Sequence, residues 1–148
     1  MNDLDEVGGR LLVIYDGHCG LCNRSVRWSL ARDRADRLRF VASDSPKVAG
    51  LLARHGFIAE PHQEGPGSIL VVRNAGRPTE QLLLRSDAIV ALLGELPSPW
   101  PALAVWLRLA PRPLRDLGYR LVARSRYRIW GRLATCPIPT AQERGRFL

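Results

Sequence analysis

Apolar positions follow two different rhythms along the first half of the chain. Short apolar runs such as LLVIY at 11–15 are typical of buried strands. Between them lie segments in which apolar residues recur every three or four positions, as in an amphipathic helix. The pattern predicts a strand at 11–15, a helix that opens at 19–22 and continues to about 30, a strand at 38–42 and a helix at 46–55. In the second helix Val48, Leu51 and Leu52 share the predicted buried face.

The next part of the chain predicts a hairpin followed by a third helix. Strands at 68–73 and 79–84 flank a turn at Asn74-Ala75-Gly76. Ser86 is the expected N-cap of a helix through about residue 93, and Asp87 favours the positive end of its dipole. The order is β-α-β-α-β-β-α, with two parallel strands joined by a crossover and then a hairpin. This order is typical of the thioredoxin-like α/β fold.

Beyond about residue 96 the chain adds helices to this core. Residues 100–109 predict a short apolar helix, and Pro113 opens a longer one that ends near Trp130, before Gly131. We expect a buried apolar stripe formed by Leu114, Leu117, Leu121 and Ile129. We expect the other faces to carry Arg115, Arg120, Arg124, Arg126 and Arg128. The whole chain, 1–148, is expected to form one domain, with its core at about 11–95 and a helical extension at about 96–148.

The candidate chemistry lies where the first strand gives way to the first helix. Asp16 and Gly17 break the strand, and Cys19-Gly20-Leu21-Cys22 opens the helix. A dithiol at this place is typical of redox proteins, since the N–H groups and the dipole of a helix N-terminus favour a thiolate. We expect Cys19 to be exposed before the helix and to act as the nucleophile. Cys22, one turn inside, is expected to resolve the mixed disulfide.

Two neighbours of the dithiol each have a functional and a structural interpretation. Asp16 either relays a proton to or from Cys22, or braces the turn at Gly17 through backbone N–H groups. His18 either favours the Cys19 thiolate when protonated, or is an exposed loop histidine. We count Asp16 with the two cysteines as the candidate catalytic residues.

The pattern Asp16-Gly17-x-Cys19-x-x-Cys22 resembles that of the DCC family of thiol-disulfide oxidoreductases, named for an Asp and two Cys residues. The resemblance covers residues 12–148 and also includes Arg85-Ser86-Asp87-Ala88, 111–116, Tyr119, 124–128, Gly131, Cys136 and 146–148. It implies a thioredoxin-like fold and thiol-disulfide exchange with protein or small-molecule substrates. The resemblance therefore names a chemistry rather than a pathway.

Charge and composition limit the remaining possibilities. The formal net charge is +8, and Lys47 is the one lysine among 148 residues. This charge permits contact with acidic partners, but the arginines are spread along the chain, so we expect no nucleic-acid function. The arginine-rich helix is the candidate surface for an acidic partner or a membrane surface. The acidic segment 1–10 is no signal peptide, and the apolar segment 96–110 is too short to span a bilayer, so we expect a cytoplasmic protein.

A non-catalytic interaction module is the alternative to an enzyme. Its dithiol would be structural, or would bind zinc with Cys136 and one histidine from among His18, His55 and His62. In this alternative the arginine-rich helix would dock the partner. The paired spacing of a structural zinc site is missing, because Cys136 has no second ligand near it in the sequence. We therefore expect no metal and no cofactor.

Overall fold

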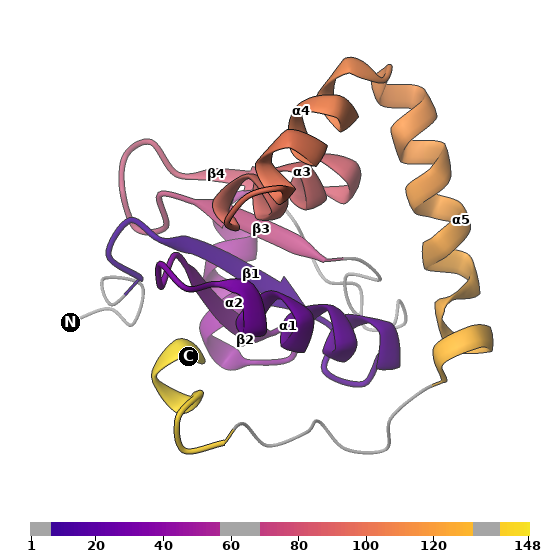
Figure 1. The fold of residues 1–148 in the computed structure, drawn as a ribbon. Helices are drawn as coiled ribbons and strands as arrows, with labels where there is room; N and C mark the ends of the chain where they lie inside the picture. The colour runs from indigo at the N-terminus through magenta and orange to yellow at the C-terminus, as the bar shows by residue number, and fades with distance from the viewer. Residues whose placement is uncertain (1–6, 57–68, 132–139) are drawn as a thin grey trace.

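The computed structural model describes residues 7–56, 69–131 and 140–148 (Figure 1). The elements in chain order are β1 (Leu11–Tyr15), α1 (Gly20–Arg32), β2 (Leu38–Ala42), α2 (Pro46–Arg54), β3 (Leu70–Arg73), β4 (Gln81–Leu83), α3 (Arg85–Glu95), α4 (Trp100–Leu109), α5 (Arg112–Trp130) and the short 3₁₀ helix η2 (Arg144–Arg146). Every strand and helix expected from the sequence is present, with β3 and β4 shorter than predicted.

The four strands form one mixed sheet in the order β2-β1-β3-β4. β1 and β2 are parallel, with Leu11 opposite Leu38 and Tyr15 opposite Ala42, because α1 returns the chain to the same end of the sheet. β3 runs antiparallel to β1, and β4 runs antiparallel to β3. This topology confirms the predicted thioredoxin-like α/β fold.

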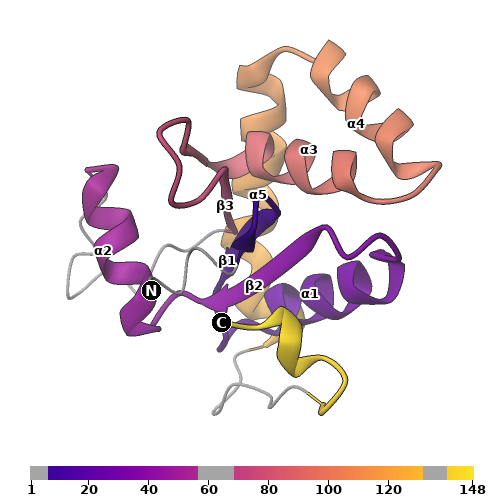
Figure 2. The same ribbon diagram turned by 90° about the vertical axis from the view of Figure 1, so that its left-hand side faces the viewer.

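Helices cover both faces of the sheet, with α1 and α3 on one face and α2 on the other (Figures 1 and 2). Successive residues of β1 point to opposite faces. Leu11, Val13 and Tyr15 belong to the cluster with α1 and α3, whereas Leu12 and Ile14 belong to the cluster with α2. The second cluster contains the predicted buried face of α2, formed by Val48, Leu51 and Leu52. All of β1 is buried, so the turn that follows it starts from a fixed point.

The start of α3 differs from the prediction. The N-cap of α3 is Leu84, and Ser86 lies inside the first turn. The Ser86 hydroxyl instead donates a hydrogen bond to Oδ1 of Asp116 in α5, at 2.5 Å. Asp87 stays in the first turn as predicted, and there it pairs with two arginines of α5. The prediction of Ser86 as the cap was wrong because its hydroxyl bonds to the neighbouring helix α5 instead. The local sequence does not reveal that α5 lies there.

The apolar stripe predicted for α5 is not buried. Its four residues are all more than half exposed: Leu114, Leu117, Leu121 and Ile129. The side of α5 that faces the core instead carries Tyr119, whose hydroxyl accepts a hydrogen bond from the Ile69 N–H at 3.1 Å. The periodicity of a helix shows that an apolar face exists, but not that another element covers it.

The arginines of α5 divide into two groups. Arg120, Arg124 and Arg128 are exposed, as predicted for a solvated cationic face. Arg115 differs, because its side chain is only 12% exposed and its Nη2 lies 3.4 Å from Oδ1 of Asp87. The side chain of Arg126 lies outside the described residues. Within the described ranges, none of the helices has the length and apolar character needed to cross a bilayer.

The last residues of the chain return to the outer edge of the sheet. The Leu148 N–H donates to the Phe40 carbonyl at 2.9 Å, and the rings of Phe147 and Phe40 lie 5.6 Å apart. Arg146 Nη1 donates to Oδ2 of Asp33 at 3.0 Å, and the Asp33 side chain is fully buried. We call residues 146–148 the C-terminal tail. It lies along the side of β2 that faces away from β1 (Figure 2).

Candidate active site

The two cysteines lie where β1 ends and α1 begins. The Asp16 carbonyl accepts a hydrogen bond from the Cys19 N–H at 3.2 Å, and Asp16 Oδ1 accepts one from the His18 N–H at 3.0 Å. These bonds close the turn and place Cys19 at the N-cap of α1, with Cys22 in the first turn. Asp16 therefore braces the turn, as one of its two interpretations predicts. Its role as a proton relay remains a prediction.

The sulfur of Cys19 receives a hydrogen bond from the first turn of α1. The backbone N–H of Cys22 donates to Cys19 Sγ at 3.4 Å, and both residues are present as thiols. The N-terminal N–H groups of a helix and the positive end of its dipole favour a negatively charged sulfur at this place. The Cys19 sulfur thus accepts a backbone hydrogen bond at the N-terminal end of the helix.

The expected exposure of Cys19 is wrong. Cys19 is 0% exposed and Cys22 is 4% exposed. The end of α5 lies next to the start of α1, because the carbonyl of Gly131 accepts a hydrogen bond from the Gly20 N–H at 3.3 Å. A position before a helix indicates the backbone environment of a residue, but not which distant segment packs over it.

Asn23 is a site residue that the sequence reasoning missed. Its Nδ2 donates to the Gly17 carbonyl at 2.7 Å and to the Cys19 carbonyl at 2.9 Å. The side chain therefore ties the turn to the first turn of α1. The signal was a side-chain amide directly after the Cys-x-x-Cys motif, a residue type that often bonds to nearby backbone.

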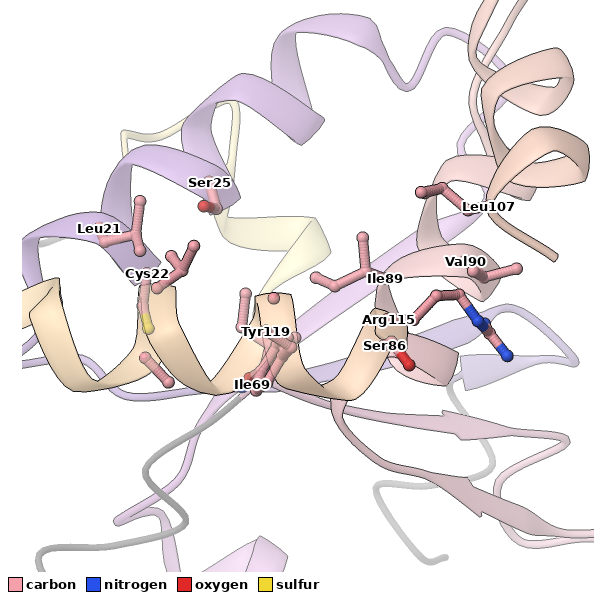
Figure 3. A pocket seen from close by; sticks show the side chains of 13 residues that line it. Leu21, Cys22, Ser25, Ile69, Ser86, Ile89, Val90, Leu107, Arg115 and Tyr119 are labelled. Carbon is pink, nitrogen blue, oxygen red and sulfur yellow. Dashed lines mark hydrogen bonds between the residues drawn. The ribbon is translucent and has the colours of Figure 1, made fainter. Parts of the chain in front are cut away.

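A cavity of about 350 Å³ lies beside Cys22, between α1, α3 and α5 (Figure 3). Cys22, and not Cys19, lines it. Its other lining residues are Leu21, Ser25, Ile69, Ser86, Ile89, Val90, Leu107, Arg115, Gly118, Tyr119, Val122 and Ala123. Local sequence patterns give no sign of this cavity, because its walls come from helices that are far apart in the chain.

The histidines described by the structure form contacts with carboxylates. His18 Nε2 lies 3.8 Å from Oδ2 of Asp44, and its side chain is 44% exposed, which fits an exposed loop histidine. His55 Nε2 lies 2.8 Å from Oε1 of Glu80. Over residues 7–56, 69–131 and 140–148, no group of three or more His, Cys, Asp or Glu side chains could hold a metal ion. Two residues considered as zinc ligands lie outside these ranges: Cys136 and His62.

A thioredoxin-like sheet with a Cys-x-x-Cys pair at the start of its first helix is the arrangement typical of thiol-disulfide oxidoreductases. The chain belongs to the DCC1-like thiol-disulfide oxidoreductase family, whose model matches residues 13–132. It is 31% identical over 133 residues to a chloroplastic DCC family protein of Arabidopsis thaliana, covering 90% of this chain and 72% of that protein. It is 26% identical over 144 residues to the uncharacterized protein YuxK of Bacillus subtilis, covering 97% of each. No solved structure gives a significant match.

Proposed function

We propose that this chain catalyses thiol-disulfide exchange, with Cys19 as the nucleophile and Cys22 as the resolving thiol. The observation that carries the proposal is the hydrogen bond from the Cys22 N–H to Cys19 Sγ at the N-cap of α1. A thiolate is the reactive form of a cysteine, and this contact favours it. The family match supports thiols and disulfides as the substrate class.

In the reducing direction, the Cys19 thiolate attacks one sulfur of a substrate disulfide and expels the other as a thiolate. Cys22 then loses its proton, for which Asp16 is the candidate acceptor, and attacks the Cys19 sulfur. This step releases the second substrate thiolate and leaves a Cys19–Cys22 disulfide, so that two electrons have passed to the substrate. Because Cys19 is buried, its attack on a large substrate requires the segments that cover it to move, and the end of α5, which contacts Gly20, is the candidate.

The proposal includes a working location and a domain organisation. A dithiol that reduces its substrates is kept reduced in the cytoplasm, which is therefore the proposed location. Residues 1–148 are proposed to act as one domain, and two long-range contacts support this. The end of α5 lies on the start of α1, and the C-terminal tail pairs with β2.

The test compares serine variants of the two cysteines with insulin as the disulfide substrate. Cys22→Ser retains the nucleophile but lacks the resolving thiol, so a mixed disulfide through Cys19 should accumulate and survive non-reducing electrophoresis. Cys19→Ser should form no such adduct. A structural or zinc-binding dithiol would instead give loss of folding from either substitution, with zinc released from the wild-type protein on denaturation. That result, with no trapped adduct, would refute the proposal.

A second candidate function rests on the outer surface of α4 and α5. All but one of the exposed large apolar side chains in the described ranges lie on these two helices. They are Leu103, Val105, Trp106, Leu109, Leu114, Leu117, Leu121, Val122 and Ile129. The exposed cations Arg120, Arg124 and Arg128 lie on the same helix, α5. We call these side chains, without Val122, which lines the cavity, the apolar-cationic face.

We propose that the apolar-cationic face contacts an anionic membrane surface. Apolar side chains flanked by arginines are typical of helices that lie in the interface of a bilayer, where the charges meet lipid phosphates. The formal net charge of +8 adds long-range attraction to such a surface. An acidic protein would satisfy the arginines, but it would leave the exposed tryptophan and leucines less well matched than lipid does.

Vesicle sedimentation tests the membrane contact. The protein should bind phosphatidylglycerol vesicles, fail to bind phosphatidylcholine vesicles, and dissociate in high salt. Replacing Leu114, Leu117 and Leu121 with Gln should abolish binding. Leu84→Gln is the matched control, because Leu84 is exposed but lies outside the face. Binding to soluble polyglutamate without binding to anionic vesicles would identify an acidic protein partner and overturn the membrane proposal.

A further inference from the structure

The cavity beside Cys22 has two chemically different ends. In Figure 3 Cys22 and Leu21 stand at one end, and Arg115 stands at the other. On α5 the lining residues run from Arg115 to Ala123, which is about 12 Å along the helix axis. Ile89 and other apolar side chains form the wall between the two ends. The volume, about 350 Å³, is within the range of small-molecule sites.

The Arg115 end carries a buried donor that the protein itself does not satisfy. The Arg115 side chain is 12% exposed, and its Nη2 pairs with Asp87 Oδ1 at 3.4 Å. Its Nε–H is buried and has no hydrogen-bond partner among the described residues. A buried N–H without an acceptor costs about 1–3 kcal/mol, so the protein satisfies this guanidinium only in part.

The charges around this end favour an anionic acceptor over a neutral one. The single carboxylate of Asp87 is shared by two guanidinium groups, those of Arg112 and Arg115. The other nearby carboxylate, Asp116, interacts with Arg112 and also with Arg85. Three arginines therefore face two aspartates, which leaves positive charge for a ligand carboxylate.

The opposite end presents a sulfur that belongs to the proposed redox pair. Cys22 lines the cavity, whereas Cys19 does not. In the oxidised protein, a thiolate that enters the cavity meets the Cys22 side of the disulfide. Attack on that sulfur expels Cys19, which is the better leaving group because the N–H of Cys22 and the helix N-terminus favour its thiolate.

We propose that this cavity binds a small dithiol whose apolar chain ends in a carboxylate, and that this molecule re-reduces the protein. The inference rests on the proposed thiol-disulfide exchange at Cys19 and Cys22. The carboxylate pairs with the guanidinium group of Arg115, the chain lies along the apolar wall, and the thiols reach Cys22. The cavity then supplies the electrons, while disulfide substrates react at Cys19.

The electrons and atoms balance in two steps. One ligand thiolate attacks Cys22 Sγ, so a ligand–Cys22 disulfide forms, the Cys19–Cys22 bond breaks and Cys19 leaves as a thiolate. The second ligand thiol, after deprotonation, attacks the ligand sulfur of that mixed disulfide and expels the Cys22 thiolate. The ligand becomes a cyclic disulfide, the protein regains two thiols, and the two protons of the ligand pass to the protein sulfurs.

The test measures how fast small dithiols reduce the oxidised full-length protein. Dihydrolipoate carries a carboxylate, dihydrolipoamide carries the neutral amide on the same chain, and dithiothreitol has neither chain nor charge. At equal concentrations below saturation, dihydrolipoate should reduce the protein about tenfold faster than dihydrolipoamide does. This is the difference that one charge-assisted hydrogen bond would give. Arg115→Gln should abolish this preference. The matched control Arg108→Gln, at an exposed arginine of α4, should retain it.

A second variant tests the proposal if the substitution of Arg115 impairs folding. Gly118 lines the cavity on α5, and a Cβ added there would meet no other atom within 4 Å, so the side chain of Gly118→Leu should extend into the cavity. It should lower the rate with dihydrolipoate by about tenfold relative to the rate with dithiothreitol, because the larger side chain occupies the volume that the longer ligand needs.

The possible outcomes separate the two proposals. If dithiothreitol reduces the protein normally but wild type shows no preference for dihydrolipoate, the cavity proposal fails and the exchange chemistry stands. A preference that survives in Arg115→Gln overturns it in the same way. If no Cys19–Cys22 disulfide forms on oxidation at all, the proposed function itself fails.

Discussion

The carbonyl oxygen of Gly131 accepts a hydrogen bond from the backbone N–H of Gly20 at 3.3 Å. The residue that ends α5 therefore lies on the first residue of the dithiol helix. Gly131 has a φ of 74°, a left-handed conformation that suits glycine and allows the helix to end there. The contact between α5 and the dithiol helix thus involves one distant glycine in a left-handed conformation.

A substitution at this glycine should expose the nucleophile. Gly131→Ala introduces a side chain where φ is positive, which costs about 1–2 kcal/mol and should loosen the end of α5. Alkylation of Cys19 by iodoacetamide at neutral pH should become faster. Gly56→Ala is the matched control, because Gly56 follows α2 with a φ of 69° and lies on the opposite face of the sheet. Equal acceleration in both variants would show that global unfolding, and not the cover, controls access.

The buried carboxylate of Asp33 should contribute strongly to stability. Its oxygens accept hydrogen bonds from the Arg37 N–H at 2.9 Å, the Leu38 N–H at 3.0 Å and Arg146 Nη1 at 3.0 Å. Asp33→Asn should lower the free energy of unfolding by about 3 kcal/mol. The amide removes the negative charge that pairs with Arg146, and its NH₂ group is a donor in a buried site where an acceptor is needed. Urea denaturation measures this change.

The control for this substitution is Asp36→Asn. Asp36 also pairs with arginines, but its side chain is 43% exposed, so solvent screens the interaction. We expect a loss below about 1 kcal/mol. Equal losses of unfolding free energy in the two variants would contradict the argument that burial makes the Asp33 interactions stronger than those of Asp36.

The Glu80 carboxylate should make stability depend on acidic pH. Burial acts to raise the pKa of Glu80, but hydrogen bonds from the Gly76 N–H, His55 and Arg54 outweigh it and hold the pKa below the ordinary value of 4.5. The unfolded state therefore binds a proton more readily, so this stabilisation is present above pH 4.5 and is lost as the pH falls through the lowered pKa. Denaturation curves of Glu80→Gln should show less loss of stability on acidification than wild type. Identical pH profiles would rule out this contribution.

The exposed arginines of α5 should matter little for folding. Replacing Arg120, Arg124 and Arg128 together with Gln should leave the Tm nearly unchanged, since surface ion pairs contribute at most about 1 kcal/mol each. The same variant should lose binding to anionic vesicles. Arg146→Gln is the contrasting substitution, because Arg146 donates to the buried Asp33 and its loss should lower the Tm. A large fall in Tm for the triple variant would mean that these arginines are structural.

Cys136 is expected to take no part in the exchange reaction. It lies far along the chain from Cys19 and Cys22, in a segment outside the described residues. Cys136→Ser should therefore retain most of the insulin-reducing activity. If its activity falls as far as that of Cys22→Ser, a relay of three cysteines would have to replace the two-cysteine cycle.

The local parts of the fold could be predicted from the sequence, because they depend on residues that are neighbours in the chain. Apolar runs such as 11–15 and the helical spacing of Val48, Leu51 and Leu52 fixed elements that the structure confirms. The dithiol was also found at the expected junction of strand and helix. Each of these inferences needed only local periodicity and turn chemistry.

The predictions that failed all concern contacts between distant segments. Ser86 was expected to cap its own helix, but it bonds to Asp116 of α5. Cys19 was expected to be exposed, but the end of α5 packs near it. Leu117 and its neighbours were expected to be buried, but they face solvent. The position of α5 decides all three, and nothing in the local pattern specifies which side of a helix another element will cover.

The C-terminal tail also affects how the protein behaves at high concentration. A strand at the edge of a sheet offers a row of backbone donors and acceptors to which a strand of another molecule can add. In this fold β2 would be such a strand, but Leu148 occupies the Phe40 carbonyl and the Phe147 ring lies against Phe40. The tail thus protects the β2 edge of the sheet from pairing with a strand of another molecule.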